Sequence, residues 1–165
     1  MLTRWIEKLV PRLLWRHRAN SWGFSEDDAE FSILPDFVER RKLSLDVGGA
    51  GGTYTAMLIP LSKRVVVFEP IPSVASKLRT LFAGTSLVSV EQVALSDTSG
   101  VVTMRVPTDL YWRGTIEPGN RLRHSAAVDE ITVTRRTIDE YALDNVGFVK
   151  IDVEGHELAV LLISQ

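Results

Sequence analysis

A glycine-rich turn between a predicted strand and a predicted helix constrains the fold of this chain more than any other feature. The turn Asp46–Gly52 follows an apolar run over residues 43–47 and precedes a helix that we expect to begin near Thr53. Glycines at such a turn let a ligand approach the backbone closely, beside the positive end of the helix dipole. The spacing is Asp-x-Gly-x-x-x-Gly, which differs from the Gly-x-Gly-x-x-Gly turn that holds a dinucleotide pyrophosphate. Because a carboxylate repels a pyrophosphate, the turn favours a ligand with an ammonium group.

A second acid, Glu69, closes the next apolar run at residues 65–68. A carboxylate in this position can accept hydrogen bonds from ribose hydroxyls. Together with Asp46, it points to S-adenosylmethionine (SAM), a nucleoside with an amino-acid tail and no phosphate. Each part alone has a plain structural explanation, since glycines mark tight turns and acids often end strands. The ordered set of strand, turn, helix, strand and acid favours a nucleotide-type ligand.

The composition narrows the class of protein. A chain of 165 residues is long enough for one domain with a sizeable core, and its net charge of −2 gives no reason to expect nucleic acid as a partner. The absence of cysteine excludes disulfides and thiolate metal sites, and fits a cytoplasmic enzyme. No run approaches the ~20 apolar residues of a membrane span, and the N-terminus lacks the apolar core of a signal peptide. We therefore expect a cytoplasmic location.

The N-terminal segment is strongly basic. Within residues 1–18, cationic side chains recur at every fourth position, interleaved with apolar ones. One alternative is a basic amphipathic helix that makes peripheral contact with a membrane or docks on a partner. Pro11 interrupts such a helix, so an accessory helix covering the core is the favoured interpretation. We predict a helical extension over residues 1–30 and a ligand-binding domain over residues 31–165.

Apolar periodicity predicts alternating strands and helices. The predicted strands are residues 43–47, 64–68, 87–95, 101–106, 131–135 and 148–151, and the predicted helices are residues 54–59, 74–82 and 137–143, with one more after Gly155. The strand at 101–106 should pair antiparallel, whereas the segments 43–47, 64–68 and 148–151 are typical of buried strands in a parallel sheet. This order predicts an α/β, Rossmann-like three-layer sandwich with a mostly parallel sheet. Ligands bind beyond the carboxyl ends of such strands, where Asp46, Glu69 and Asp152 fall.

A long segment, residues 107–130, shows little periodicity. It carries Tyr111, Trp112, Arg113, Arg121, Arg123 and His124. Irregular segments of this length are often lids or binding loops. Its arginines either meet an anionic group of a substrate or are simply solvated, and the sequence does not choose between these alternatives.

Five titratable side chains crowd into the eight residues Lys150–Glu157. His156 is suited to act as a general base for a hydroxyl, and Asp152 to orient that hydroxyl or accept its proton. A divalent cation held by Asp, Glu and His is a less favoured alternative. In a purely structural interpretation Lys150 pairs with a carboxylate while the acids favour the start of a helix. A functional role is favoured for Asp152, whereas for His156 both interpretations stay open.

The sequence resembles FkbM-type methyltransferases in five ordered motifs. These are Asp46–Thr55, Phe68–Pro70, Ala94–Asp97, Arg136–Asp139 and Lys150–Glu157, within a resemblance that covers about residues 40–163. The resemblance implies a class I SAM-dependent fold and transfer of a methyl group to oxygen. It further implies an acceptor hydroxyl on a sugar, glycolipid or polyketide.

The same resemblance implies roles for individual residues. It assigns Asp46, Gly48, Gly49, Gly52, Tyr54, Glu69, Pro70, Ala94 and Leu95 to SAM binding. Among them Asp46, Gly48 and Gly52 would border the methionine part, Glu69 the ribose, and Ala94 with Leu95 the adenine edge. Asp152 would lie near the transferred methyl group, with His156 as the second catalytic candidate, and no metal is implied.

Two departures from the family pattern affect these expectations. Family members usually carry Ala-Asn where this chain has Gly49 and Ala50, and they continue with further strands where this chain stops at residue 165. We therefore expect an incomplete sheet with an exposed edge, which favours self-association. The alternatives to an active enzyme are an inactive methyltransferase-like module that acts in binding or assembly, and a nicotinamide-dependent dehydrogenase. The glycine spacing and the Asp46 carboxylate argue against the dehydrogenase.

Overall fold

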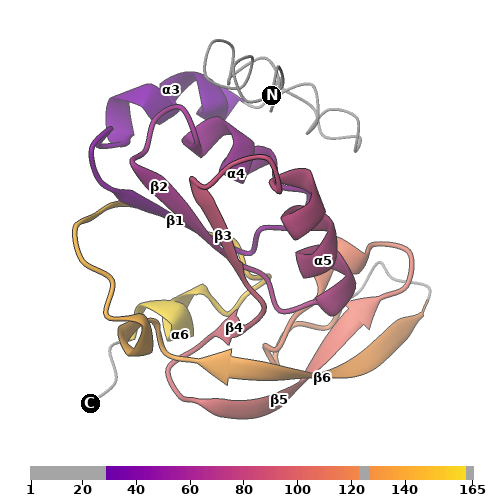
Figure 1. Ribbon diagram of the computed structural model, residues 1–165. Helices are drawn as coiled ribbons and strands as arrows, with labels where there is room; N and C mark the ends of the chain where they lie inside the picture. Colours follow the sequence, from indigo (N-terminus) through magenta and orange to yellow (C-terminus); the bar gives the residue numbers. More distant parts are fainter. Residues whose placement is uncertain (1–28, 123–126, 163–165) are drawn as a thin grey trace.

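The computed structural model describes residues 29–122 and 127–162. The basic segment 1–18, and with it the predicted membrane contact, lies outside the described residues, as do Arg123 and His124. The described part forms a parallel sheet with helices on both faces, and a second, smaller sheet beside it (Figure 1).

Four parallel strands make the central sheet. In spatial order they are β3 (Val88–Glu91), β2 (Arg64–Phe68), β1 (Leu43–Val47) and β7 (Val146–Ile151). All three ladders between neighbours are parallel. The inner strands β1 and β2 are buried along nearly their whole length without alternation, because both of their faces are covered. The predicted bounds of these two strands are confirmed.

Two hydrophobic clusters lie on opposite faces of this sheet and define three layers. One face packs against α3 (Ala29–Phe37), α4 (Thr53–Leu58) and α5 (Pro72–Leu81). The other face packs against the short helices η2 (Ile138–Tyr141) and α6 (Glu157–Leu161). Helix α5 buries Val74, Ala75, Leu78 and Leu81 at helical spacing. The predicted α/β Rossmann-like architecture is confirmed.

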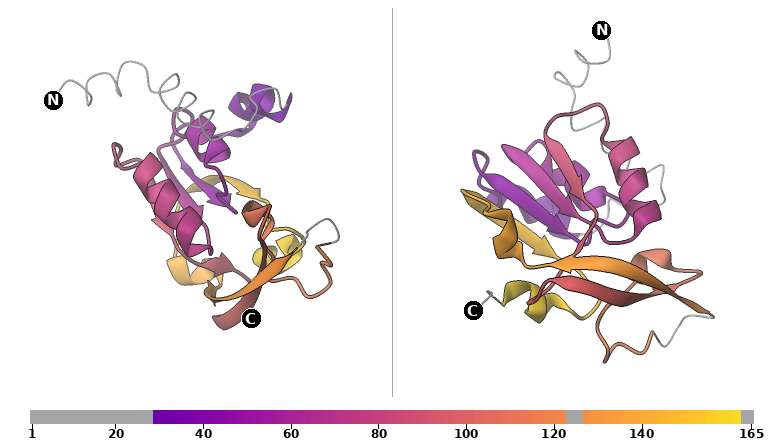
Figure 2. Two further views of the ribbon diagram at one scale, coloured as in Figure 1. Left: turned by 90° about the vertical axis from the view of Figure 1, so that its right-hand side faces the viewer. Right: turned by 60° about the horizontal axis from the view of Figure 1, so that its bottom comes forward.

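The second sheet has the order β4-β6-β5, from β4 (Ala94–Leu95), β5 (Gly100–Pro107) and β6 (Val128–Arg136). Figure 2 shows it set apart from the parallel strands. Strands β5 and β6 pair antiparallel, as predicted for 101–106. The prediction of a single strand over 87–95 is wrong. The pairing of β3 with β2 ends at Glu91, and Ala94–Leu95 pair with β6 instead.

The helix predicted from Thr137 is shorter and tighter than expected. Thr137 and Glu140 form the predicted capping box, in which the Thr137 backbone N–H donates to Glu140 Oε1 at 3.2 Å. The helix is a 3₁₀ turn that ends at Tyr141, with Ala142 in the left-handed region at φ 43°. The cap therefore starts the turn, although the helix does not reach Leu143.

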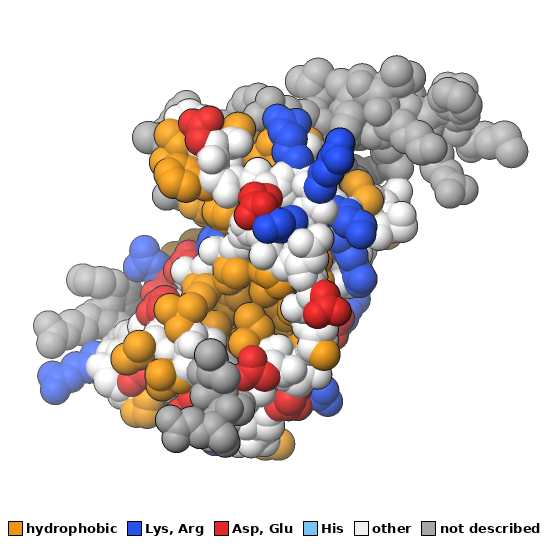
Figure 3. All heavy atoms as spheres, turned by 90° about the vertical axis from the view of Figure 1, so that its left-hand side faces the viewer, with side chains coloured by type: hydrophobic (Ala, Val, Ile, Leu, Met, Phe, Trp, Pro, Cys, Tyr) orange, Lys and Arg blue, Asp and Glu red, His pale blue; other side chains and the backbone are white. Residues whose placement is uncertain are grey.

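Strand β7 is the outer strand of the parallel sheet within the described residues. The exposed hydrophobic side chains of this region are Ile33 and Phe37 on α3, Val149 on β7, and Leu158, Leu161 and Leu162 at α6. Figure 3 shows apolar side chains gathered on the face that carries these elements. Self-association through this edge stays a prediction. In the described ranges no helix has the length and apolarity that crossing a membrane requires.

Candidate functional site

The carboxyl ends of β1, β2 and β7 meet at one edge of the sheet. Backbone hydrogen bonds tie them together just beyond the last paired residues. Gly48 N–H donates to the Phe68 carbonyl at 2.9 Å, and Asp152 N–H donates to the Val47 carbonyl at 3.0 Å. Glu69 N–H donates to the Glu91 carbonyl at 3.0 Å. The three segments that carry the predicted acids are therefore adjacent in space, as the parallel arrangement required.

The glycine-rich turn leaves no room for a side chain at Gly48, Gly49 or Gly52. Gly48 has φ +84°, and a Cβ atom there would lie 1.9 Å from the Asp152 carbonyl oxygen. A Cβ on Gly49 would lie 2.4 Å from Val67 Cγ1, and a Cβ on Gly52, the N-cap of α4 at φ +82°, would lie 2.9 Å from Leu78 Cδ2 on α5. Ala50 also has positive φ, at 42°. The turn thus exposes backbone rather than side chains where a ligand would approach.

Glu69 is a buried carboxylate held by the backbone of this turn. Its Oε2 accepts the N–H of Ala50 at 3.1 Å, and its Oε1 accepts the N–H of Ile71 at 2.9 Å. The residue is only 5% exposed. Burial raises the pKa of Glu69 from 4.5 to about 7, against the lowering effect of the two N–H donors. Glu69 therefore joins the glycine turn to β2 and changes its charge near neutral pH.

Asp46 is fully buried and faces a cation. Its Oδ2 accepts a 2.6 Å hydrogen bond from Thr55 Oγ1, and its Oδ1 lies 3.4 Å from the ammonium of Lys150. Lys150 also donates to the Gly48 carbonyl at 2.8 Å and lies 5.1 Å from the centre of the Tyr54 ring. For Lys150 these contacts agree with the purely structural interpretation, in which it pairs with a carboxylate. They also lock the end of β7 to the glycine turn.

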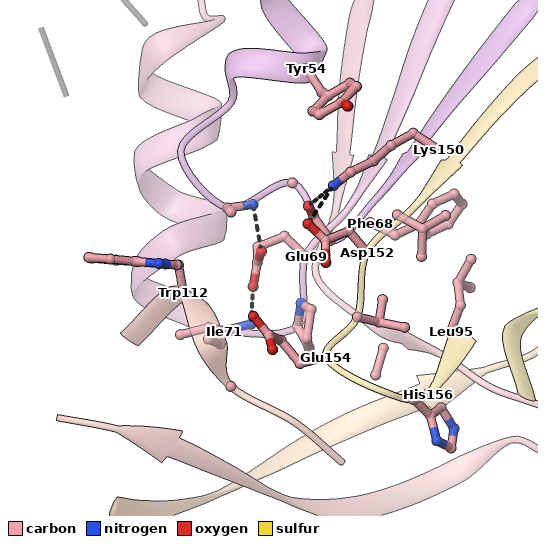
Figure 4. A pocket seen from close by; sticks show the side chains of 18 of the residues that line it. Tyr54, Phe68, Glu69, Ile71, Leu95, Trp112, Lys150, Asp152, Glu154 and His156 are labelled. Carbon is pink, nitrogen blue, oxygen red and sulfur yellow. Dashed lines mark hydrogen bonds and ion pairs between the residues drawn. The ribbon is translucent and has the colours of Figure 1, made fainter. Parts of the chain in front are cut away.

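A cavity of about 260 Å³ opens beside these strand ends (Figure 4). The predicted residues that line it are Gly48, Gly49, Tyr54, Glu69, Pro70, Ala94, Leu95, Asp152 and His156. Asp46 and Gly52 are not on its wall: Asp46 lies buried behind the turn, and Gly52 packs on α5. Trp112 and Ile116 from the long segment also line the cavity. Part of the aperiodic segment therefore forms a wall of the site, whereas Arg121 is exposed away from it.

Beyond β7, the turn at residues 152–156 carries three polar side chains that point in different directions. Figure 4 shows Asp152 beside Lys150, Glu154 directed into the cavity, and His156 at the margin. The Asp152 side chain is 69% exposed, with its Oδ2 3.7 Å from the Lys150 ammonium. Glu154 has φ +56°, an uncommon conformation for any residue other than glycine. The turn is thus shaped to direct Glu154, rather than its neighbours, toward the centre of the cavity.

Both ring nitrogens of His156 are engaged. Nδ1 lies 3.1 Å from Glu117 Oε2, and Nε2 lies 3.0 Å from Ser96 Oγ. The hydrogen bond from His156 lowers the pKa of the Glu117 carboxyl below its usual value. His156 therefore connects three segments, namely the β7 turn, the long segment and the residue after β4. Its role as a general base stays a prediction.

Sequence reasoning did not single out Glu154 or Glu117 as functional residues. In the sequence Glu154 is one acid of the cluster Lys150–Glu157 close to a helix start, and its left-handed backbone leaves no sequence signal other than the following Gly155. Glu117 lies in the aperiodic segment, and nothing in the sequence indicates that it meets His156. The described residues also contain no group of three or more His, Asp or Glu side chains arranged to hold a metal.

Comparison with known proteins gives one family. The sequence model of the methyltransferase FkbM domain matches residues 46–165, which is well over half of the chain. The matched range begins at the buried acid of β1 and includes every residue that lines the cavity except Phe31. No curated protein matches the chain.

Proposed function

The chain belongs to the FkbM methyltransferase family, and from that premise we propose that it is a SAM-dependent O-methyltransferase. One observation carries the choice of methyl donor. A buried carboxylate, Glu69, faces a cavity next to a turn in which Gly48 and Gly49 tolerate no Cβ atom. This arrangement suits a ligand with ribose hydroxyls on one side and a tail packed on backbone on the other.

The residues present fit the three parts of SAM. Glu69 would accept hydrogen bonds from the ribose hydroxyls, because its two oxygens already face the turn and have lone pairs to spare. Lys150 is the only ammonium or guanidinium group among the described residues on the cavity wall, so it would face the methionine carboxylate. The apolar wall at Ala94 and Leu95 would receive the adenine ring.

The charge on the wall supports the same proposal. Three carboxylates line the cavity, Glu69, Asp152 and Glu154, against the single ammonium of Lys150. SAM carries a sulfonium and an ammonium group, and an acidic wall favours both. A dinucleotide with a pyrophosphate would meet repulsion in the same place. The acidic wall also supports a neutral acceptor over an anionic one.

When bound, SAM supplies an electrophilic methyl group. The chain would contribute by binding and orienting the two reactants, because a methyl transfer of this kind gains mainly from proximity and alignment. Trp112, Ile116 and Met104 give the cavity an apolar side that would exclude water from the reacting atoms. For the acceptor we propose a hydroxyl on a sugar, glycolipid or polyketide.

The test is calorimetric titration of SAM into the purified chain and into two variants. We expect the wild type to bind, and Glu69→Gln to weaken binding by about tenfold through loss of a charged acceptor. Glu130→Gln is the matched control, since Glu130 is exposed on β6 away from the cavity and should bind like the wild type.

Three outcomes would count against the proposal. A folded wild-type chain that binds no SAM would favour the inactive module that acts in binding or assembly. Binding of a nicotinamide dinucleotide in place of SAM would favour a dehydrogenase. If Glu69→Gln and Glu130→Gln weaken SAM binding equally, Glu69 does not bind the ribose.

A further inference from the structure

Glu154 has a strained backbone that the surrounding structure maintains. Its φ of +56° places a residue with a full side chain in the left-handed region, which costs about 1 kcal/mol or more relative to glycine. Such conformations persist where neighbours fix them, and they concentrate at functional sites. The glycine that immediately follows, Gly155, also has positive φ, at 101°.

Two side chains from the long segment hold Glu154 in this conformation. Thr115 Oγ1 donates to the Glu154 carbonyl at 2.9 Å, and Asn120 Nδ2 donates to the same oxygen at 2.8 Å. Thr115 itself is buried, at 1% exposure. The segment that carries these donors is fixed in turn by Arg105, whose Nη2 donates to the carbonyls of Glu117 and Asn120. The backbone of Glu154 is thus held by two hydrogen bonds from a segment that is itself fixed by Arg105.

The carboxylate of Glu154, by contrast, is left available. It lines the cavity, and within the described ranges neither a hydrogen bond nor an ion pair engages it. Burial is the main cause that raises the pKa of Glu154, with the nearby charge of Asp152 second; Arg113 opposes the rise and Glu157 adds to it. A partly buried carboxylate with a raised pKa is a stronger proton acceptor than an exposed one.

The two neighbouring candidates are less available. Asp152 is mostly exposed, and its Oδ2 is already engaged by the Lys150 ammonium 3.7 Å away. His156 has both ring nitrogens occupied by Glu117 and Ser96. A base must be able to reach the proton that it abstracts. Of the three polar side chains on this turn, Glu154 is the one whose position meets this requirement.

We infer that Glu154 is the carboxylate that faces the transferred methyl group and accepts the proton of the acceptor hydroxyl. The inference rests on the proposed SAM-dependent O-methylation. In that step the acceptor oxygen forms a bond to the methyl carbon while the carbon–sulfur bond breaks, and its electron pair stays on sulfur. The hydroxyl proton passes to Glu154, and S-adenosylhomocysteine leaves. His156 is then a positioning residue that fastens the turn on which Glu154 stands.

The test uses two ligands that differ at the reacting atom, so that no acceptor is needed. S-adenosylhomocysteine has no methyl group on sulfur, whereas in sinefungin a carbon that bears an amine replaces the sulfur and its methyl. A carboxylate that faces the methyl position should pair with that amine. We therefore expect the wild type to bind sinefungin more tightly than S-adenosylhomocysteine, by about tenfold.

The variants assign this preference to one residue. Glu154→Gln should lose the preference for sinefungin and keep the wild-type affinity for S-adenosylhomocysteine, which also reports that the variant is folded. Asp152→Asn should keep the preference. His156→Gln should weaken both ligands together and leave their ratio unchanged, as expected of a positioning residue.

The outcomes separate this inference from the proposed function. If S-adenosylhomocysteine binds and the preference survives in Glu154→Gln, or disappears in Asp152→Asn instead, the role of Glu154 is wrong while SAM binding stands. If the folded wild type binds neither ligand, the proposed function fails and the role of Glu154 fails with it.

Discussion

The cavity has two walls that are held together over very different distances along the chain. At the wall formed by β1 and β2, Glu69 bonds to Ile71 and Ala50, which lie 2 and 19 residues away. At the wall formed by the β7 turn, Glu154 bonds to residues 34 and 39 positions away, and His156 to Ser96 across 60 positions. The Glu69 contacts of the first wall, called the local wall below, therefore span shorter stretches of the chain than the Glu154 and His156 contacts of the second, called the tertiary wall.

This difference separates binding from reaction. The local wall offers glycine backbone and the buried Glu69, which suit a ligand common to many enzymes. In the tertiary wall, two hydrogen-bond donors from the long segment fix the backbone of Glu154, and the Glu154 side chain points into the cavity. We expect changes at the first wall to alter affinity for the methyl donor, and changes at the second to alter how the reacting end of the ligand is recognised.

The largest effect should come from the point where the two walls touch. In Gly48→Ala the new Cβ would lie 1.9 Å from the Asp152 carbonyl, a backbone atom that cannot move without breaking the contact between β7 and β1. We expect a loss of at least about 5 kcal/mol in the free energy of unfolding, measured by chemical denaturation.

Gly100→Ala is the matched control for this change. Gly100 also has positive φ, at 143°, but no atom lies within 4 Å of its missing Cβ. Gly100→Ala should lose about 1–3 kcal/mol in the free energy of unfolding, from backbone strain alone. Equal losses of stability in the two variants would mean that Gly48 and the Asp152 carbonyl are not in close contact.

The next effect concerns the lysine that links the walls. In Lys150→Met the carboxylate of Asp46, which is 0% exposed, would lose its cation while it stays buried. Breaking a buried ion pair from one side typically costs about 3–5 kcal/mol, and we expect a loss in this range. The measurement is the unfolding free energy of both single variants and the double variant with Asp46→Asn. The double variant should be more stable than the sum of the two losses predicts, and simple additivity would contradict the pairing.

The third effect is a pH dependence that belongs to the local wall. The pKa of Glu69 is about 7 in the folded chain, above the 4.5 of an unperturbed glutamate, so the folded state holds a proton that the unfolded state releases. The contribution of Glu69 is therefore fully present below about pH 4.5 and is lost as the pH rises through about 7. The loss has an upper limit of about 3 kcal/mol.

Glu69→Gln isolates this contribution, because glutamine does not titrate. The wild type should lose stability relative to Glu69→Gln between about pH 5 and about pH 8, as followed by urea denaturation of the unliganded proteins. A constant difference across this range would show that Glu69 stays ionised in the folded chain.

The same contrast between local and tertiary contacts decides what the sequence can predict. The bounds of β1 and β2 follow from short segments rich in apolar residues, and the capping box at Thr137 from a four-residue pattern. The split of residues 87–95 into β3 and β4 depends on pairing with β6, about 40 residues further on, which no local pattern records. The aim of Glu154 depends likewise on Thr115 and Asn120, so the sequence revealed the acid but not its direction.

The smallest effect tests one residue of the glycine turn. Ala50 has φ +42°, a region that asparagine and glycine tolerate better than alanine, and the family pattern has asparagine there. The chain already uses asparagine in this conformation at Asn145, with φ 58°. We expect Ala50→Asn to raise the free energy of unfolding by about 0.5–1 kcal/mol. Ala142→Asn, at φ 43° and outside the cavity, should gain a similar amount.

Comparing these two variants separates stability from recognition. Both should raise the denaturation midpoint, but only Ala50→Asn changes the cavity wall and hence the affinity for SAM. Ala83→Asn serves as the control, since Ala83 is exposed and its φ is not positive, so no gain is expected. A gain at Ala142 without one at Ala50 would mean that contacts within the turn, rather than the backbone conformation, determine which residue position 50 prefers.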